Sequence, residues 1–167
     1  MERTGKITFK GNPMTLIGPE LKVGDKAPDF TVVDTTLQPV KLSDFHGQVV
    51  ILSAVPSLDT PVCELQTKRF NEEASKSNAK VLTISLDLPF AQKRFCSSFQ
   101  IENVMTLSDY KDRSFAHAFG LLIKELGLIT RAVFVVNQEG KIVYQEIVNE
   151  VTEQPDYEKA LAAAKNA

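Results

Sequence analysis

Apolar and polar positions divide the chain into strand-like and helix-like segments. Residues 5–18 alternate apolar and polar side chains on both sides of "KGNP", which predicts a β-hairpin. Residues 48–55 form a continuous run rich in β-branched residues, typical of a strand buried on both faces of a sheet, and residues 79–87 are predicted to form a second buried strand. Shorter strands are predicted at residues 30–34 and 104–109, with a turn-rich connection at residues 35–47.

Helical spacing follows the first buried strand, at residues 60–76. Pro61 suits the first helical position, and Leu65 and Phe70 lie near one face of the predicted helix. Strands, helices and a hairpin then alternate to the end of the chain: helices at 88–100, 113–123 and 155–167 (starting at Pro155), and a hairpin at 131–148 around Asn137–Gly140. This order predicts an α/β fold with a central mixed β-sheet flanked by helices. It resembles the thioredoxin-like arrangement with an N-terminal β-hairpin extension at residues 1–18.

Composition excludes several classes of protein. A length of 167 residues predicts a single domain over residues 1–167. With 43% hydrophobic and 24% charged residues and a net charge of −2, neither nucleic acid nor a membrane surface is an expected partner. No apolar stretch of about 18 residues and no secretory leader pattern occurs, so a cytoplasmic location is expected.

The cysteine count points to redox or catalytic chemistry. Two cysteines in 167 residues do not form a disulfide framework of the small secreted kind. The two cysteines and two histidines are far apart in sequence and lack the paired spacing of a zinc site, so no metal is expected.

One of the cysteines, Cys63, falls in the first turn of a predicted helix. Thr60 is a candidate N-cap, which places Pro61 to Cys63 at the first three helical positions, where backbone N–H groups lack intrahelical partners. Helix N-termini favour a thiolate over a thiol, and the thiolate is the nucleophile. The local pattern leaves open a second interpretation, a cysteine buried only for packing.

The stretch "PSLDTPVC" resembles the active-site loop of the peroxiredoxins, and Pro56, Thr60 and Cys63 match it position by position. The segments "VGDKAPDFTVVD", "SLDLPFAQKRFC" and residues 127–161 resemble the thiol peroxidase branch, the atypical two-cysteine peroxiredoxins of the thioredoxin-like superfamily. The resemblance therefore covers nearly the whole chain. Val55 stands where many relatives have an aromatic residue, so the preferred hydroperoxide does not follow from the resemblance.

The resemblance implies a set of site residues that are catalytic or bind substrate. Cys63 would be the peroxidatic cysteine, and the Thr60 hydroxyl would bond both the thiolate and the peroxide. Pro56 would shield the site from water, and Arg131 would stabilise the thiolate and orient the peroxide. Without the resemblance, Arg131 is better interpreted as a solvated charge at the start of a strand.

The resemblance also assigns Cys96 as the resolving cysteine. Cys63 oxidised to sulfenic acid would form an intramolecular disulfide with Cys96, and thioredoxin would reduce that disulfide. The substrates would be hydrogen peroxide and organic hydroperoxides, the protein would be a homodimer, and no cofactor would be needed. Without the resemblance, Cys96 between Phe95 and Phe99 suggests a buried helical cysteine. Because two helices carry the two cysteines, local unfolding is expected before the sulfurs meet.

Two rival functions remain at this point. One is a non-enzymatic thiol redox sensor or binding module on the same fold. The other is a Cys-His hydrolase that uses His46 or His117, but neither histidine falls in a motif that places it against the thiol. Ser57 and Asp59 are interpreted as turn residues with local hydrogen bonds, and Glu64 as a charge that complements the helix dipole.

Overall fold

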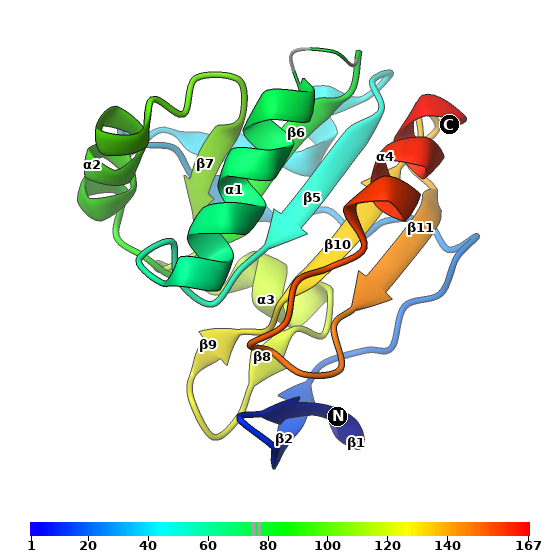
Figure 1. Ribbon diagram of the computed structural model, residues 1–167. Helices are drawn as coiled ribbons and strands as arrows, with labels where there is room; N and C mark the ends of the chain where they lie inside the picture. The colour runs from blue at the N-terminus through cyan, green and yellow to red at the C-terminus, as the bar shows by residue number, and fades with distance from the viewer. Residues whose placement is uncertain (75, 77) are drawn as a thin grey trace.

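A mixed sheet lies at the centre of the structure, a computed structural model that describes residues 1–74, 76 and 78–167 (Figure 1). Within those residues its strand order is β11-β10-β5-β6-β7-β3-β4. The central strands β5, β6 and β7 are parallel to one another, and the outer pairings are antiparallel. The strands are β3 (Thr31–Val33), β4 (Pro39–Lys41), β5 (Val50–Ala54), β6 (Lys80–Ser85), β7 (Met105–Ser108), β10 (Ala132–Val136) and β11 (Ile142–Ile147).

A second, smaller sheet contains the N-terminal hairpin. In the described part of the chain its order is β1 (Glu2–Phe9), β2 (Asn12–Ile17), β8 (Leu122–Ile123) and β9 (Leu128–Ile129). The hairpin predicted at residues 5–18 is confirmed. The strands β8 and β9 were not predicted, because strands of two residues have no periodicity to detect.

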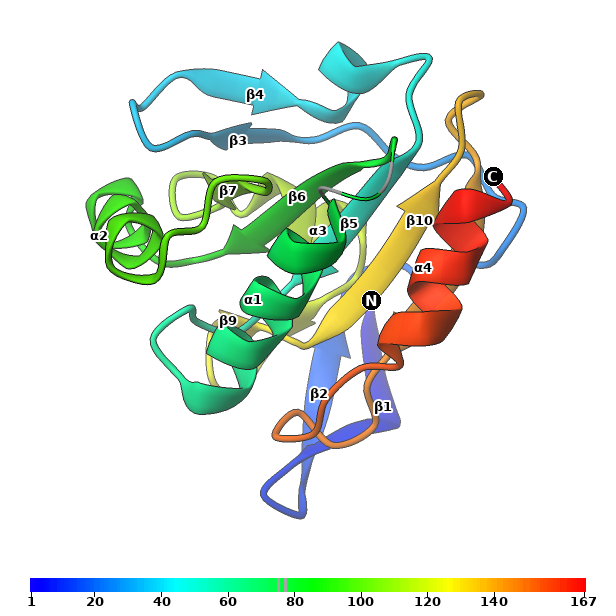
Figure 2. The ribbon, with the colours of Figure 1, turned by 45° about the horizontal axis from the view of Figure 1, so that its top comes forward.

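Helices cover both faces of the central sheet, as predicted. Figure 2 shows α1 and α4 side by side over one face, and α3 packs into the apolar cluster on the other. The helix α2 packs against β7. The helices are α1 (Pro61–Ala74), α2 (Pro89–Phe99), α3 (Ser114–Ala118) and α4 (Tyr157–Lys165), with a short 3₁₀ helix, η1, at Leu42–Phe45.

The apolar strands divide their side chains between the two faces. In β10, Val133 and Val135 join the cluster under α1 and α4, whereas Phe134 joins the cluster around α3. In β5, Ile51 and Leu52 separate in the same way. Successive side chains of a strand point to opposite faces, so a strand covered on both faces is buried along its length and is mostly apolar. The run at residues 48–55 predicted this burial correctly.

The buried face of α1 differs from the predicted one. Phe70 is fully buried, but Leu65 is 55% exposed. The buried positions are Cys63, Gln66, Thr67 and Phe70, which repeat at the helical spacing of three and four residues. Gln66 and Thr67 are polar, so a prediction from hydrophobicity alone placed Leu65 on the face of Phe70, and this placement is wrong. The predicted helix runs to residue 76, beyond the last residue of α1, and residue 75 lies outside the described residues.

Gly120 ends the helix that was predicted to continue to residue 123. Gly120 has a φ of +64°, and an added Cβ would lie 2.0 Å from the carbonyl oxygen of Pro19. Only glycine fits such a close approach in the left-handed region. The chain therefore leaves α3 at Ala118 and enters β8 at Leu122.

Two smaller differences concern element boundaries. The turn-rich connection at residues 35–47 contains the short strand β4 and the helix η1. The C-terminal helix begins at Tyr157 rather than at Pro155, because the Asp156 side chain caps it by accepting a hydrogen bond from the Lys159 backbone N–H. The hairpin around Asn137–Gly140 is confirmed as β10 and β11.

Candidate active site

Cys63 lies where the central strand β5 passes into α1. The loop after Ala54 carries Pro56, which is buried, and α1 begins at Pro61. The Cys63 side chain is 0% exposed, on the sheet side of the helix. Its place in the first turn is as predicted, and the unpaired N–H groups of that turn give it a positive electrostatic environment.

Arg131 reaches the same point from the residue before β10. Its Nη2 donates to Cys63 Sγ over 3.1 Å, and Nε donates to the carbonyl oxygen of Val151 over 2.8 Å. The guanidinium is 2% exposed, so it is a buried cation rather than a solvated charge. Burying a cation costs free energy unless an anion faces it. Two of the guanidinium nitrogens bond neutral oxygens of Val151 and Gln66, and Nη2 bonds the sulfur of Cys63, which can carry a negative charge. Arg131 therefore places a buried positive charge against the sulfur of Cys63.

Gln66, which was not predicted as a site residue, holds the Arg131 guanidinium in place. Its Oε1 accepts a hydrogen bond from Arg131 Nη1 over 2.9 Å, and its Nε2 donates to Ser53 Oγ over 2.8 Å. Gln66 is fully buried one helical turn after Cys63. A polar residue three positions from the nucleophile, on the same helix face, is the sequence signal that could have found it.

The N-terminal hairpin supports the same arginine from the other side. Backbone hydrogen bonds join Thr8 of β1 to the loop at residues 149–151: the Val151 N–H donates to the Thr8 carbonyl over 2.9 Å. The Glu150 carboxylate accepts from the Thr8 hydroxyl and from Thr152. Hydrogen bonds from the backbone of Thr152 and from the hairpin lower the pKa of Glu150 to about 2. The carbonyl of Val151, which holds Arg131, is thus part of a fixed loop.

Thr60 and Pro56 lie in the loop that the resemblance indicated. The backbone carbonyl of Thr60 accepts the N–H of Glu64 over 2.9 Å, which places Thr60 just before the first helical turn. Its hydroxyl donates to the carbonyl of Ser57 over 3.2 Å, so in this structure the Thr60 proton is directed to the loop itself. The hydroxyl oxygen keeps its acceptor capacity, which a peroxide O–H would require.

Cys96 lies on α2, and both cysteines are free thiols. Cys96 packs against the apolar cluster that contains Cys63, and its Sγ lies 3.3 Å from Thr106 Oγ1. Burial raises the pKa of the Cys96 thiol, and the hydrogen bond with Thr106 opposes this shift. Lys68 of α1 lies 4.3 Å from the centre of the Phe99 ring on α2, so the two cysteine-bearing helices are neighbours.

Ser57 and Glu64, which were interpreted from the sequence as structural residues, make the following contacts. Ser57 makes the expected local bond, accepting from the Asp59 N–H over 3.2 Å, and it also donates to Asp87, 30 residues further along the chain, over 2.7 Å. The purely local interpretation of Ser57 was therefore incomplete. Glu64 lies in the first turn, as its dipole role requires, and forms a partly buried ion pair with Lys68 over 3.1 Å.

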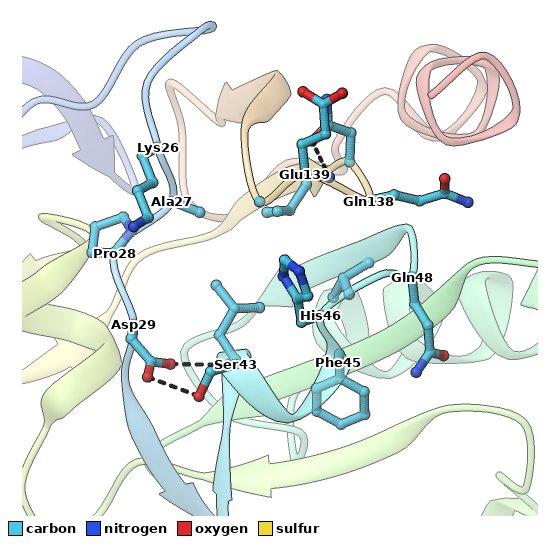
Figure 3. Close-up of a pocket in the computed structure, with 15 residues that line it drawn as sticks. Lys26, Ala27, Pro28, Asp29, Ser43, Phe45, His46, Gln48, Gln138 and Glu139 are labelled. Carbon is cyan, nitrogen blue, oxygen red and sulfur yellow. Dashed lines mark hydrogen bonds between the residues drawn. The ribbon is translucent and has the colours of Figure 1, made fainter.

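The histidines of the hydrolase interpretation lie away from Cys63. His46 lines a cavity of about 610 Å³ (Figure 3), whose wall includes Val50 at the start of β5. Cys63 follows the other end of that strand, and the five residues of β5 span about 13 Å. His117 is exposed on α3, whose buried residues belong to the opposite apolar cluster. The structure therefore brings neither histidine to the thiol.

A smaller cavity borders the Cys63 loop. It has a volume of about 200 Å³ and lies between this loop and α2; its lining includes Leu58, Asp59, Asp87, Arg94, Phe95 and Phe99. Among the described residues, no group of three or more His, Cys, Asp or Glu side chains is arranged to hold a metal ion. None of the helices in the described ranges has the length and apolar character needed to cross a membrane.

Comparisons with known proteins give a consistent family. The model of the Redoxin family matches residues 22–161. A thiol peroxidase of Halalkalibacterium halodurans is 57% identical, over 96% of this chain and 98% of that protein. A thiol peroxidase of Bacillus subtilis is 56% identical, over 96% of each chain. The crystal structure of a peroxiredoxin-like protein from Aquifex aeolicus superposes with a TM-score of 0.91 at 45% identity, over 98% of both chains.

Proposed function

The chain belongs to the Redoxin family and to its thiol peroxidase branch, and we propose that Cys63 is the residue that attacks the peroxide. The observation that carries this proposal is the 3.1 Å contact between Arg131 Nη2 and Cys63 Sγ, both on buried residues, in the first turn of α1. Cys63 is the cysteine that faces a buried cation, whereas Cys96 faces the hydroxyl of Thr106.

The first step needs an anionic sulfur and donors for the charge that develops on oxygen. The Cys63 thiolate attacks one oxygen of the peroxide, the O–O bond breaks, and the other oxygen leaves as hydroxide or alkoxide. Cys63 becomes a sulfenic acid. Arg131 supplies N–H donors that stay in place during this change, because Gln66 and Val151 hold them. Thr60 and Pro56 complete the proposed site by orienting the peroxide and excluding water.

Cys96 is proposed to resolve the sulfenic acid. Its thiol attacks the Cys63 sulfur, a disulfide forms and water leaves. Each sulfur is packed in the apolar cluster beneath its own helix, so the loop before α1 and part of α2 must move first. Burial raises the pKa of the Cys96 thiol, and exposure of this sulfur would remove that shift.

Thioredoxin is the proposed reductant, and a coupled assay tests it. With thioredoxin, its reductase and NADPH, the protein should sustain oxidation of NADPH by hydrogen peroxide and by cumene hydroperoxide for many turnovers. Glutathione with glutaredoxin is the matched control and should support far less. A single stoichiometric oxidation without turnover would instead match the redox sensor, which the peroxidase relatives do not favour.

Arg131→Met should lower the rate constant for the peroxide step by about 10²-fold, because one fixed donor to the developing charge is lost. Arg131→Lys keeps the charge but not the planar guanidinium, and it is the matched control. Its rate constant for the peroxide step should lie between those of the wild type and Arg131→Met. Equal rate constants for the peroxide step in all three proteins would refute the electrostatic role.

The remaining proposals concern assembly and location. A homodimer is supported by apolar side chains that α1 and α2 leave exposed beside the Cys63 loop: Leu65, Phe90 and Phe99. A cytoplasmic location is supported by the low cysteine content, which suits a compartment where thiols stay reduced.

A further inference from the structure

A single carboxylate joins the Cys63 loop to the start of the helix that carries Cys96. Asp87 lies between β6 and α2 and is half-buried. Its Oδ1 accepts a hydrogen bond from Ser57 Oγ over 2.7 Å, and its Oδ2 accepts the backbone N–H of Leu58 over 2.7 Å. Both donors belong to the loop that precedes Cys63. The two oxygens of Asp87, a residue of the connection between β6 and α2, therefore hold that loop in place.

The same carboxylate is anchored on the other side by a buried network. Ser85 Oγ donates to Asp87 Oδ2 over 2.7 Å and accepts Nε2 of Gln92 over 3.1 Å. Gln92 is fully buried on α2, and its Nε2 also donates to the carbonyl of Leu107 over 2.8 Å. Gln92 precedes Cys96 by one helical turn on the same face of α2. The network thus runs from the loop of one cysteine to the helix of the other.

We propose that Asp87 is a positioning residue that clamps the Cys63 loop and thereby sets how the Cys63 sulfenic acid divides between disulfide formation and further oxidation. This proposal rests on the proposed roles of Cys63 and Cys96. The carboxylate touches neither sulfur, and it acts through Ser57 and Leu58.

The two fates of the sulfenic acid need different states of the loop. In the clamped loop the sulfur stays beside Arg131, where its sulfenate can attack a second peroxide; it becomes a sulfinate, and the peroxide is reduced to an alcohol or water. In the released loop the sulfur can reach Cys96, and a disulfide and water form. Because the two reactions compete, a weaker clamp increases disulfide formation at the expense of sulfinate.

The donors to this carboxylate are neutral groups, two hydroxyls and a backbone N–H. Hydrogen bonds to a charged acceptor are about twice as strong as those between neutral groups. Asp87→Asn removes the charge, and the amide nitrogen that replaces one oxygen cannot accept a hydrogen bond. The clamp should therefore weaken without a change in side-chain volume.

The test compares Asp87→Asn with Asp59→Asn, which makes the same change on an exposed carboxylate of the same loop. Each protein is mixed with peroxide in a quench-flow instrument, alkylated, and analysed by mass spectrometry for Cys63–Cys96 disulfide and Cys63 sulfinate. In Asp87→Asn the ratio of disulfide to sulfinate should rise by about tenfold, the loss of one charge-assisted bond. Asp59→Asn should match the wild type.

Ser57→Ala is a milder second variant that removes the Oδ1 bond alone, and it decides the test if Asp87→Asn does not fold. It should raise the same ratio, by less than Asp87→Asn. A merely structural role would lower the melting temperature and leave the ratio unchanged, and that result would overturn the proposal. A wild-type protein that forms no Cys63–Cys96 disulfide at all would count against the proposed function instead, which keeps the two failures distinct.

Discussion

Cys63→Ser is expected to abolish peroxide turnover. A serine hydroxyl is not ionised near neutral pH, and its oxygen is a far poorer nucleophile toward an O–O bond than a thiolate. The buried guanidinium of Arg131 cannot compensate, because it stabilises an anion that serine does not provide. The measurement is the thioredoxin-coupled assay with hydrogen peroxide, at enzyme concentrations high enough to detect a residual rate.

The fold of Cys63→Ser should survive, because oxygen and sulfur differ little in volume at this fully buried position. Circular dichroism and the thermal transition of the variant serve as the control for folding. A folded Cys63→Ser protein with a normal rate would show that another group attacks the peroxide.

Cys96→Ser should separate the two chemical steps. The reaction with the first equivalent of peroxide should keep its rate, because Cys96 contacts Thr106 and lies outside the contact between Arg131 and Cys63. Turnover with thioredoxin should stop, because no intramolecular disulfide can form. The sulfenic acid at Cys63 should then proceed to sulfinic acid as the peroxide concentration rises, a form that thioredoxin does not reduce.

Quench-flow measurement of Cys63 oxidation and steady-state turnover test this separation in the same sample. Thr106→Val is a useful companion, because it removes the hydrogen bond to Cys96 and keeps the thiol. It should retain turnover. If Cys96→Ser keeps full thioredoxin-linked turnover, Cys96 has no part in resolution.

Long, patterned segments of the fold could be predicted from sequence. The strands β5, β6 and β10 are buried along nearly their whole length because the sheet is covered on both faces, and their runs of apolar and β-branched residues reflect this burial. Elements without a pattern were not predicted. One example is β8, which follows the close approach of the Gly120 backbone to Pro19. A close backbone approach between distant segments leaves no periodic signal.

The site shows the same division. The position of Cys63 in a first helical turn could be predicted from helix-start signals, but these left open whether it is a nucleophile or a packed side chain. Arg131 is 68 residues away, and only the resemblance connected the two residues. Gln66 and the carbonyl of Val151 were missed. Hydrophobic periodicity predicts a polar residue such as Gln66 on the helix surface. Gln66 is buried instead, because the buried guanidinium of Arg131 needs a hydrogen-bond acceptor. A backbone carbonyl such as that of Val151 has no sequence signature.

The most direct test of the central claim is the mass of the protein after one equivalent of hydrogen peroxide. The wild type should lose two hydrogens, and peptide mapping without reduction should give one crosslinked species that joins Cys63 to Cys96 within a chain. A bridge between the Cys63 residues of two chains, with Cys96 still a free thiol, would contradict the account and assign resolution to a different mechanism.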